Sequence, residues 1–340
     1  MRVLLVKLSS MGDLTHALPA ITDAACAIPG ISFDWVIDKS FSEIASWHPA
    51  VKNVITSSHR VWKKNLIKSF KSGELKKFVK SVRKEKYDLI IDGQTSLKSA
   101  LIMSLARGLK CGLDKNSCRE WIAHLFYKKQ FCVDKELHAI QRLRSLFSQA
   151  LGYTLSDTIP NYGISNKNFL APNFDLPKNY IVCVHNASWK SKLWPKEYWR
   201  KLIDLAVADG FNVLLPWGNL LEKERATYIA NKNGNAYVLP FCSLSEHAYI
   251  LINAKGAICS DTGLSHLAAS LNVPSLTLYG STSEVLIGTT GSHQTHFVSP
   301  FKCKKCYNQT CLYEEKVHED AVCQLSMSPE EVWRKFILLL

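Results

Sequence analysis

The chain has 340 residues, of which 47% are hydrophobic, and a formal net charge of +13. This length can bury the cores of two ordinary domains, and the composition excludes a disordered or fibrous chain. No apolar stretch reaches the roughly 18 residues of a membrane span, and residues 2–7 predict a first strand instead of a signal peptide. We therefore expect a cytoplasmic globular protein whose partner is an anionic ligand or surface.

Basic residues are concentrated in the first half of the chain, over residues 60–86 and again over 98–144. A lysine-rich helix is commonly a solvated face, but an excess confined to one half favours binding to an anionic surface. Neither half has the interleaved aromatic and glycine pattern of an RNA-binding sheet, a zinc-finger spacing or a helix-turn-helix signature. We therefore expect no nucleic-acid partner.

Residues 1–160 alternate between apolar runs and amphipathic stretches. We predict strands over residues 2–7, 33–37, 53–56 and 89–92, with helices from Asp13, over 66–86, from Ser96 and over 138–151. Strands separated by helices form a parallel sheet with right-handed crossovers. Residues 1–160 are therefore predicted to be one doubly wound domain.

A segment without clear periodicity, residues 161–178, is predicted to be a linker. The alternation then restarts, with strands predicted over residues 180–185, 212–216, 236–239, 257–260 and 275–279. Residues 179–326 are therefore predicted to form a second doubly wound domain. The last segment, 327–340, predicts a helix with Ser328 at its N-cap, and we expect this helix to pack back toward the N-terminal domain.

The predicted fold is α/β, with two Rossmann-like domains whose strands direct their carboxyl ends toward ligands in a cleft between the domains. Neither first strand is followed by Gly-x-Gly-x-x-Gly, which disfavours a nicotinamide or flavin dehydrogenase. The absence of Gly-x-x-x-x-Gly-Lys-Ser/Thr excludes a P-loop NTPase. The sequence also lacks Asp-x-Asp, so we do not expect a metal-bridged diphosphate.

The most informative segment is 256–269, in which a short apolar run ends at Ser260 and a helical pattern follows. The helix is predicted to start at Thr262 or Gly263, where unpaired backbone amides and the positive end of the helix dipole suit a phosphate. The Thr262 hydroxyl would add a polar group, and His266 lies one turn along. The alternative is an ordinary strand-to-helix turn that Asp261 caps.

A second candidate lies at the end of the first predicted strand. Gly12 permits a tight turn, and Asp13 then falls at the start of a helix, at the carboxyl edge of the sheet. Asp13 is either a helix cap or a general base that faces the cleft. No other acidic residue is near it in the sequence, so a base at this position would act alone.

The second domain has polar residues at the corresponding positions. Lys192, between the first strand and first helix of this domain, could offset the charge of a departing diphosphate or be a solvated loop lysine. Glu222, after the next predicted strand, could accept hydrogen bonds from ribose or sugar hydroxyls. Its alternative role is a first-turn glutamate favoured by the helix dipole.

Four of the eleven cysteines cluster near the C-terminus: Cys303, Cys306, Cys311 and Cys323. In a chain with no predicted export signal we expect reduced thiols. Thiolates at such spacings can bind zinc or an iron–sulfur cluster, but this spacing matches no common zinc module. A packed loop, with or without a disulfide, is the favoured alternative.

Three motifs in register extend over nearly the whole chain. They are Lys-x-Ser-Ser-Met-Gly-Asp ending at Asp13, Lys-x-Trp-Pro beginning at Lys192, and Asp-Thr-Gly-Leu-Ser-His over residues 261–266. With them the chain resembles the ADP-heptose:lipopolysaccharide heptosyltransferases, glycosyltransferase family 9. Segments 33–36, 46–48 and 60–64 resemble the branch that adds the first heptose to the Kdo of lipid A. The four-cysteine tail is more similar to branches that extend an existing core heptose, which is the alternative reaction.

The resemblance implies a GT-B fold, in which the N-terminal domain receives the acceptor and the C-terminal domain holds ADP-heptose. It implies inverting, metal-independent transfer of L-glycero-D-manno-heptose to Kdo2-lipid A, without a cofactor. Asp13 would be the general base, and Lys192 would offset the diphosphate charge. The residues implied at the donor are Ser188, Lys192, Glu222, Asp261, Thr262, Gly263, Leu264 and His266, with Ala187 and Ser188 in place of an expected pair of threonines.

The resemblance also implies an acceptor site in the basic half of the chain. Its residues are Ser10, Gly12, Arg60, Lys63, Lys64, Gln94, Arg119, His138 and Arg142. The basic members would meet Kdo carboxylates and lipid A phosphates, with the protein bound peripherally, as a monomer, to the cytoplasmic face of a Gram-negative inner membrane. A more remote alternative is a phosphate- or nucleic-acid-binding protein without catalytic activity.

Overall fold

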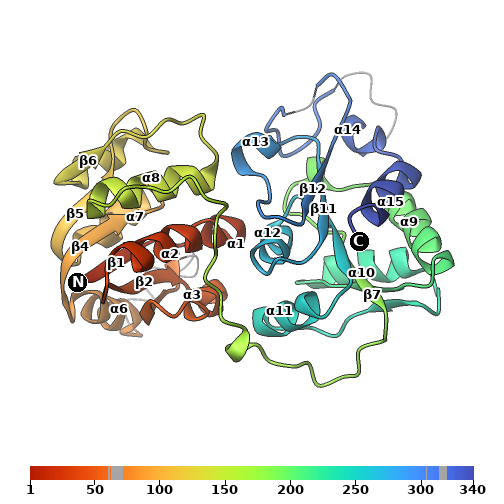
Figure 1. The fold of residues 1–340 in the computed structure, drawn as a ribbon, viewed down its shortest axis with the longest axis horizontal. Coiled ribbons are helices and arrows are strands. Elements are labelled where there is room, and N and C mark those ends of the chain that lie inside the picture. Colours follow the sequence, from red (N-terminus) through yellow and green to blue (C-terminus); the bar gives the residue numbers. More distant parts are fainter. Residues whose placement is uncertain (60–61, 63–71, 304, 314–319) are drawn as a thin grey trace. The chain divides into compact units, whose positions relative to one another are not determined.

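The computed structural model describes residues 1–59, 62, 72–303, 305–313 and 320–340. The chain forms two compact units, Met1–Ser165 and Asn166–Leu340 (Figure 1). The boundary between them falls inside the predicted linker, residues 161–178. Among the described residues, no helix combines the length and the apolarity needed to cross a bilayer.

The N-terminal unit is built on a six-stranded sheet in the order β3-β2-β1-β4-β5-β6, with every strand pair parallel. The strands are β1 (Arg2–Val6), β2 (Ser32–Asp38), β3 (Val51–Ser57), β4 (Lys86–Asp92), β5 (Arg107–Leu113) and β6 (Lys129–Phe131). Val3 to Val6 of β1 are fully buried, as expected for a central strand covered on both faces. The predicted parallel sheet is therefore confirmed.

Helices cover both faces of this sheet. They are α1 (Met11–Thr15), α2 (Leu18–Ala27), α3 (Ser42–Ser46), α6 (Glu74–Arg83), α7 (Leu97–Ser104) and α8 (Ala139–Leu151), with the 3-10 helices η1 (Lys39–Phe41) and η2 (Trp121–Phe126). The chain moves outward from β1 to β2 on one side and from β4 to β5 on the other, so right-handed crossovers place α2 and α7 on opposite faces. Helix α8 packs against α2 (Figure 1). The 3-10 helix η2 packs against α7.

The predicted basic helix over residues 66–86 is helical over Glu74–Arg83, with Phe78 and Val82 on its buried side. Residues 60–61 and 63–71 lie outside the described part of the chain. The lysines of α6 face solvent, as the solvated-face alternative predicts.

The C-terminal unit repeats the doubly wound design, with the strand order β12-β11-β10-β7-β8-β9 and parallel pairs throughout. The strands are β7 (Tyr180–Val184), β8 (Asn212–Leu215), β9 (Ala236–Val238), β10 (Gly256–Ser260), β11 (Ser275–Tyr279) and β12 (Gln294–Val298). The helices are η3 (Asn166–Asn168), η4 (Lys190–Lys192), α9 (Lys196–Ala208), α10 (Leu220–Ala230), α11 (Leu244–Ile252), α12 (Gly263–Ser270), α13 (Glu284–Ile287), α14 (Val322–Leu325) and α15 (Pro329–Ile337). Because β7 has β8 on one side and β10 on the other, the turns after these three strands meet at one edge of the sheet.

The last helix, α15, completes the core of the C-terminal unit, and the packing of segment 327–340 toward the N-terminal domain stays a prediction. Helix α15 packs against α9. Val332, Trp333 and Phe336 belong to the same core cluster as Trp199 of α9. Trp333 Nε1 also donates a hydrogen bond to Asp209 Oδ2 at 2.8 Å. The apolar face of this amphipathic helix is therefore buried within its own unit.

Candidate active site

Asp13 lies in the first turn of α1, at the carboxyl end of the central strand β1. Its Oδ2 accepts hydrogen bonds from the Ser10 amide at 2.9 Å and from Ser10 Oγ at 2.8 Å. Within the described part of the chain, no protein group donates to Oδ1. One oxygen of the carboxylate therefore caps the helix while the other is open to accept a proton.

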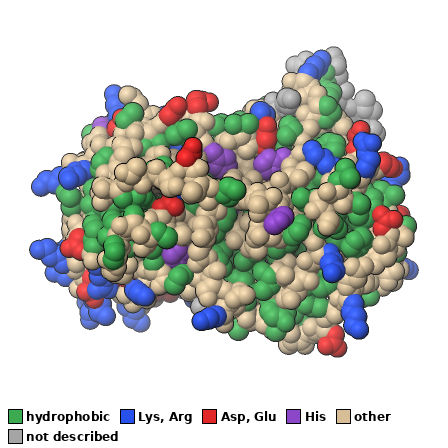
Figure 2. All heavy atoms as spheres, viewed as in Figure 1, with side chains coloured by type: hydrophobic (Ala, Val, Ile, Leu, Met, Phe, Trp, Pro, Cys, Tyr) green, Lys and Arg blue, Asp and Glu red, His purple; other side chains and the backbone are tan. Residues whose placement is uncertain are grey.

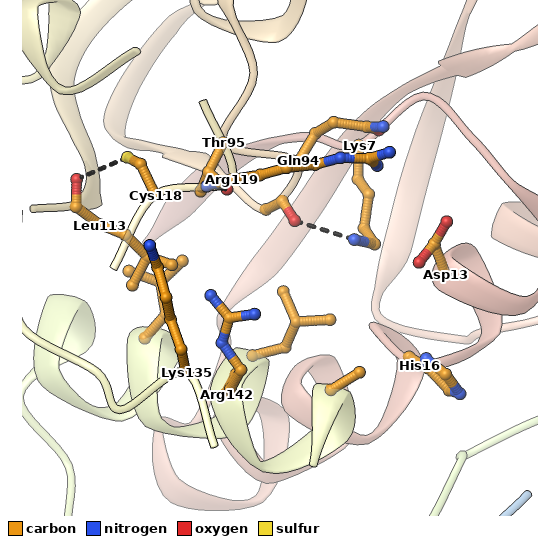
Figure 3. A pocket seen from close by; sticks show the side chains of 14 residues that line it. Lys7, Asp13, His16, Gln94, Thr95, Leu113, Cys118, Arg119, Lys135 and Arg142 are labelled. Carbon is orange, nitrogen blue, oxygen red and sulfur yellow. Dashed lines mark hydrogen bonds between the residues drawn. The ribbon is translucent and has the colours of Figure 1, made fainter. Parts of the chain in front are cut away.

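Asp13 lines a pocket of about 380 Å³ that belongs to the N-terminal unit (Figure 3). Among the predicted site residues, Gln94, Arg119 and Arg142 line the same pocket. The pocket also contains four residues that are not among the predicted site residues: Lys7, His16, Thr95 and Lys135. Four cationic side chains and one carboxylate line this pocket, so it suits an anionic ligand.

Lys7 is buried at the end of β1 and donates a hydrogen bond from Nζ to the Gly93 carbonyl at 2.8 Å. Burial lowers the pKa of Lys7, although the charges of Asp13 and Asp92 oppose that shift. For Asp13, burial raises the pKa, but the positive charge of Lys7 and the hydrogen bonds from Ser10 leave it lowered overall. Asp13 is therefore a carboxylate at neutral pH, in the form that a general base needs.

A buried carboxylate, Asp92, organises the turn at the end of β4. Its Oδ1 accepts hydrogen bonds from the Gln94 and Thr95 amides, both at 2.9 Å. Its Oδ2 accepts hydrogen bonds from Ser99 Oγ and Tyr127 Oη, both at 2.8 Å. These bonds hold Thr95 at φ 53°, a left-handed conformation that is uncommon outside glycine.

Gln94 connects this turn to the loop that precedes Asp13. Its Oε1 accepts hydrogen bonds from the amides of Leu8 and Ser9, at 2.8 and 3.2 Å. Asp92 thus acts through Gln94 on the loop that carries the candidate base. The sequence predicts residue 92 only as the end of a strand, and no motif in the chain marks it.

Arg142 projects from α8 into the pocket (Figure 3). One terminal nitrogen donates to the Ser117 carbonyl at 2.8 Å, whereas the buried Nε donates to no group in the described residues. Burial lowers the pKa of Arg142. A buried donor without a protein acceptor is uncommon, and an anionic ligand in the pocket would supply the missing acceptor.

The remaining predicted acceptor residues fall into three groups. Ser10 and Gly12 belong to the turn that holds Asp13. His138 caps α8, and its ring centroid lies 5.6 Å from that of the pocket residue His16, in an edge-on contact. Arg60, Lys63 and Lys64 lie outside the described residues.

The C-terminal unit places its own charged cluster at the turn between β10 and α12. Asp261 is buried, and its Oδ2 lies 2.7 Å from Lys192 Nζ and accepts a hydrogen bond from Thr282 Oγ1 at 2.6 Å. His266 Nε2 lies 3.8 Å from Asp261 Oδ1. Burial raises the pKa of Asp261, but His266 and Lys192 more than reverse this and hold it well below its usual range. The structure therefore brings together three of the predicted donor residues.

Helix α12 begins beside this cluster, with Thr262 as its N-cap. Thr262, Gly263 and Leu264 are all partly exposed. The amides of Gly263 and Leu264 donate to no described protein group, because the first amides of a helix have no intrahelical acceptor. Two amides without an intrahelical acceptor, at the positive end of the helix dipole and with Lys192 nearby, can bind a phosphate.

Ser188 and Glu222 lie at the same edge of the sheet, after β7 and β8 respectively. Ser188 is exposed in the loop that leads to η4. Glu222 Oε2 accepts a hydrogen bond from the Gly218 amide at 2.7 Å, and Asn219 caps the helix that follows. Glu222 therefore stabilises its own turn, and its other carboxylate oxygen accepts no hydrogen bond from the described residues.

The segment that carries three of the four clustered cysteines packs against the turn that precedes Lys192. The Ser191 amide donates to the Gln309 carbonyl at 3.0 Å, and Ser191 Oγ donates to Ser281 Oγ at 3.1 Å and to the Asn308 carbonyl. Gln324, next to Cys323, donates from Nε2 to the Ser191 carbonyl at 3.1 Å. Asn308, Gln309 and Gln324 are thus hydrogen-bonded to Ser191, the residue directly before Lys192.

All eleven cysteines are free. Burial, and then the nearby thiols of Cys303, Cys306 and Cys311, raise the pKa of Cys323 to about 12. In the described part of the chain, no group of three or more His, Cys, Asp or Glu side chains is arranged to hold a metal ion.

The family model described as Glycosyltransferase family 9 (heptosyltransferase) matches residues 75–317 of this chain. The chain belongs to glycosyltransferase family 9. A family 9 relative, the lipopolysaccharide heptosyltransferase 1 of Pseudomonas aeruginosa, is 42% identical over 342 residues, which cover 98% of this chain and 96% of the relative. The predicted resemblance to this family is therefore confirmed.

Two solved structures of a heptosyltransferase are similar to the whole chain. Escherichia coli heptosyltransferase WaaC with ADP has a TM-score of 0.88 and 38% sequence identity, and the match covers 100% of both chains. The same enzyme with ADP-2-deoxy-2-fluoro heptose has a TM-score of 0.84 and 38% identity over 99% of both chains. Together with the two parallel six-stranded sheets, this likeness confirms the predicted GT-B class of fold. The predicted position of the active site between the domains stays a prediction.

Proposed function

We propose that this family 9 glycosyltransferase transfers L-glycero-D-manno-heptose from ADP-heptose to a Kdo residue of the lipopolysaccharide inner core, with Asp13 as general base. The observation that carries the proposal is the open Oδ1 of Asp13 in a pocket lined by four cationic side chains. The similarity to an enzyme named lipopolysaccharide heptosyltransferase 1 supports the same reaction.

The chemistry of the N-terminal pocket supports an acidic sugar as acceptor. Kdo carries a carboxylate, and the buried Nε of Arg142 has no acceptor among the described residues. Arginine binds carboxylates strongly through charge-assisted hydrogen bonds. The other cations of the pocket can contact the second Kdo carboxylate or the phosphates of lipid A, so Kdo2-lipid A is the proposed acceptor.

The C-terminal unit is proposed to bind the donor. The amides of Gly263 and Leu264 would contact the diphosphate, and Lys192, fixed by Asp261, would offset the charge that develops as ADP departs. Glu222 and Ser188, at the same sheet edge, are within the region where the nucleoside or sugar hydroxyls would bind. The ADP and ADP-2-deoxy-2-fluoro heptose complexes of the similar WaaC support this assignment.

The proposed reaction is a single displacement. The acceptor hydroxyl oxygen forms a bond to the anomeric carbon of the heptose while the bond from that carbon to the diphosphate oxygen breaks. The hydroxyl proton moves to Asp13 Oδ1, and the bonding electron pair leaves with ADP. Attack opposite to the leaving group inverts the anomeric configuration, and Lys192 with the helix amides supplies the countercharge without a metal ion.

The acceptor is a lipid, and the chain carries a net charge of +13. We therefore propose that the protein works as a monomer bound peripherally to the anionic cytoplasmic face of the inner membrane. Release from membranes at high salt would support binding through charge, and retention at high salt would point to another anchor.

The decisive assay combines purified protein, ADP-heptose and a chelator with defined acceptors. We expect ADP release and heptosylation with Kdo2-lipid A, and no transfer to the same acceptor after it has received its first heptose. Transfer only to the heptosylated acceptor would support the alternative reaction, extension of an existing core heptose. Binding of ADP without transfer to either acceptor would support a phosphate-binding protein without catalytic activity.

A further inference from the structure

Three large apolar side chains are exposed on neighbouring elements of the N-terminal unit. Leu101 of α7 is 50% exposed, and Trp121 and Leu125 of η2 are 60% and 65% exposed. Because η2 packs against α7, these residues lie on the same face of the sheet. We call Leu101, Trp121 and Leu125 the η2 patch. Exposed single leucines are common, but a tryptophan and two leucines on adjoining elements need an explanation.

Burial and hydrogen bonds fix the backbone that carries the η2 patch. Ala123 of η2 is fully buried, and Tyr127, directly after η2, is 6% exposed and bonded to Asp92. The His124 carbonyl accepts a hydrogen bond from Gln130 Nε2 at 3.0 Å. Trp121 and Leu125 are thus held outward by a fixed element, which lowers the entropy cost of placing them in an apolar environment.

Exposed cations border the patch on both sides of η2. Arg119 precedes it, Lys128 and Lys129 follow it, and all three are exposed. Glu120, the acidic residue directly before η2, accepts a hydrogen bond from the Leu97 amide at 2.9 Å, so its negative charge lies at the positive end of the α7 dipole. An apolar centre with a basic border complements an anionic lipid surface, since tryptophan and leucine enter the interface while lysine and arginine meet headgroup phosphates.

The patch adjoins the acceptor pocket. Arg119 lines that pocket, and its amide donates to Thr95 Oγ1, another pocket residue, at 3.2 Å. Trp121 lies only two residues further along the chain. A lipid acceptor whose sugar occupies the pocket keeps its acyl chains in the bilayer, so the membrane surface must come close to this part of the unit.

We propose that the η2 patch inserts into the outer region of an anionic bilayer and so fixes the N-terminal unit at the membrane surface. The biological role of this contact rests on the proposed function, because it presents the pocket to a lipid-borne acceptor. The contact itself is independent of catalysis. It can therefore be tested in the absence of donor and acceptor.

The test uses vesicles of phosphatidylethanolamine with phosphatidylglycerol, and vesicles of phosphatidylcholine alone, in co-sedimentation with the full chain. The variant is Trp121→Ser/Leu125→Ser. The matched control is Ile159→Ser, which removes a residue that is 68% exposed in the same unit. Ile159 follows Thr158, whose carbonyl binds Arg144 of α8, and Arg144 pairs with Asp23 of α2, so this control lies near the α2 and α8 side of the sheet.

We expect wild-type protein to bind the anionic vesicles and to bind phosphatidylcholine more weakly. The double variant should lose about tenfold or more in partitioning, because two large apolar side chains no longer leave water. Brominated lipids should quench the fluorescence of wild-type protein more than that of Trp121→Phe. Ile159→Ser should behave like wild type.

Three results would overturn the proposal: wild-type protein that does not bind anionic vesicles, a double variant that binds as wild type does, or an equal loss of binding in Ile159→Ser.

Turnover with a water-soluble, deacylated Kdo acceptor separates this proposal from the proposed function. The double variant should retain wild-type turnover on that acceptor. If transfer fails for wild type while vesicle binding depends on the patch, the proposed reaction is wrong and the membrane contact stands.

Discussion

Lys192 Nζ and Asp261 Oδ2 lie 2.7 Å apart and join the turn after β7 to the turn after β10. The Lys192 side chain is 14% exposed and that of Asp261 is 4% exposed, so water weakens this pair little. The same lysine also stacks over the Trp189 ring, with Nζ 4.7 Å from the ring centroid. Asp261 thus holds the cation at the turn from which α12 begins.

Replacement of Lys192 tests its role at the diphosphate. In Lys192→Met we expect kcat/KM for ADP-heptose to fall by about 10²–10³-fold, because a positioned charge no longer stabilises the leaving group. The matched control is Lys190→Met, which removes an exposed lysine from the same 3-10 helix. Steady-state kinetics with varied donor would measure both. Equal, small losses in the two variants would contradict the assignment.

Ser191 tests whether the cysteine segment positions Lys192. Ser191→Ala removes the hydroxyl that binds Ser281 and Asn308, so we expect donor KM to rise about fivefold to tenfold while kcat changes less. Ser292→Ala, which removes an exposed serine hydroxyl bonded to Asn272, is the control and should behave like wild type. Titration of ADP by calorimetry gives a second readout. Unchanged ADP affinity in Ser191→Ala would contradict the positioning role.

Replacement of Lys7 tests whether its positive charge lowers the pKa of Asp13, the proposed general base. Its charge lowers the pKa of Asp13, so the uncharged variant Lys7→Met should raise that pKa. A base with a higher pKa becomes protonated at a higher pH, and the acid limb of kcat/KM should therefore shift upward. Lys7→Arg keeps the charge and should keep the limb of wild type. The pH dependence of kcat/KM for all three proteins checks this, and identical acid limbs would contradict it.

Removal of the hydrogen bond from Tyr127 Oη to Asp92 tests how much this bond stabilises the turn after β4. Tyr127→Phe leaves a buried carboxylate short of one donor, so we expect the free energy of unfolding to fall by about 1–3 kcal/mol. Tyr228→Phe removes a similar bond to Glu197 from an exposed site and should cost less than about 1 kcal/mol. Denaturant unfolding of both variants provides the comparison. A Tyr127→Phe variant as stable as Tyr228→Phe would contradict the proposed role of Asp92.

Most of the fold could be predicted from the sequence because buried parallel strands are continuous apolar runs. The strand that ends at Ser260 and the helix that follows it are where the sequence predicts them. Three strands were not predicted: β5, β6 and β12. β5 contains two glycines, β6 has three residues, and β12 is only partly buried, so none has a strong apolar pattern. Their places are set by pairing with stronger neighbours.

The site could be predicted only where a residue follows a strand at a recognisable turn. Asp13, Lys192 and Asp261 were found in this way, and the structure pairs the last two. Lys7 begins the motif that ends at Asp13, and His16 lies three residues after Asp13 at the C-cap of α1, a spacing that brings two side chains near one another. Tertiary packing brings Lys135 to the pocket and Asp92 to the turn beside it. Local sequence patterns do not predict such packing.

The central claim is that a single carboxylate takes the acceptor proton, and Asp13→Asn tests it most directly. The variant keeps the size of the side chain and can still cap α1, so donor binding should persist. With ADP-heptose and Kdo2-lipid A we expect kcat to fall by about 10²–10⁴-fold at unchanged ADP affinity. Asp157→Asn, at an exposed carboxylate, should retain full turnover. Wild-type kcat in Asp13→Asn would contradict the account.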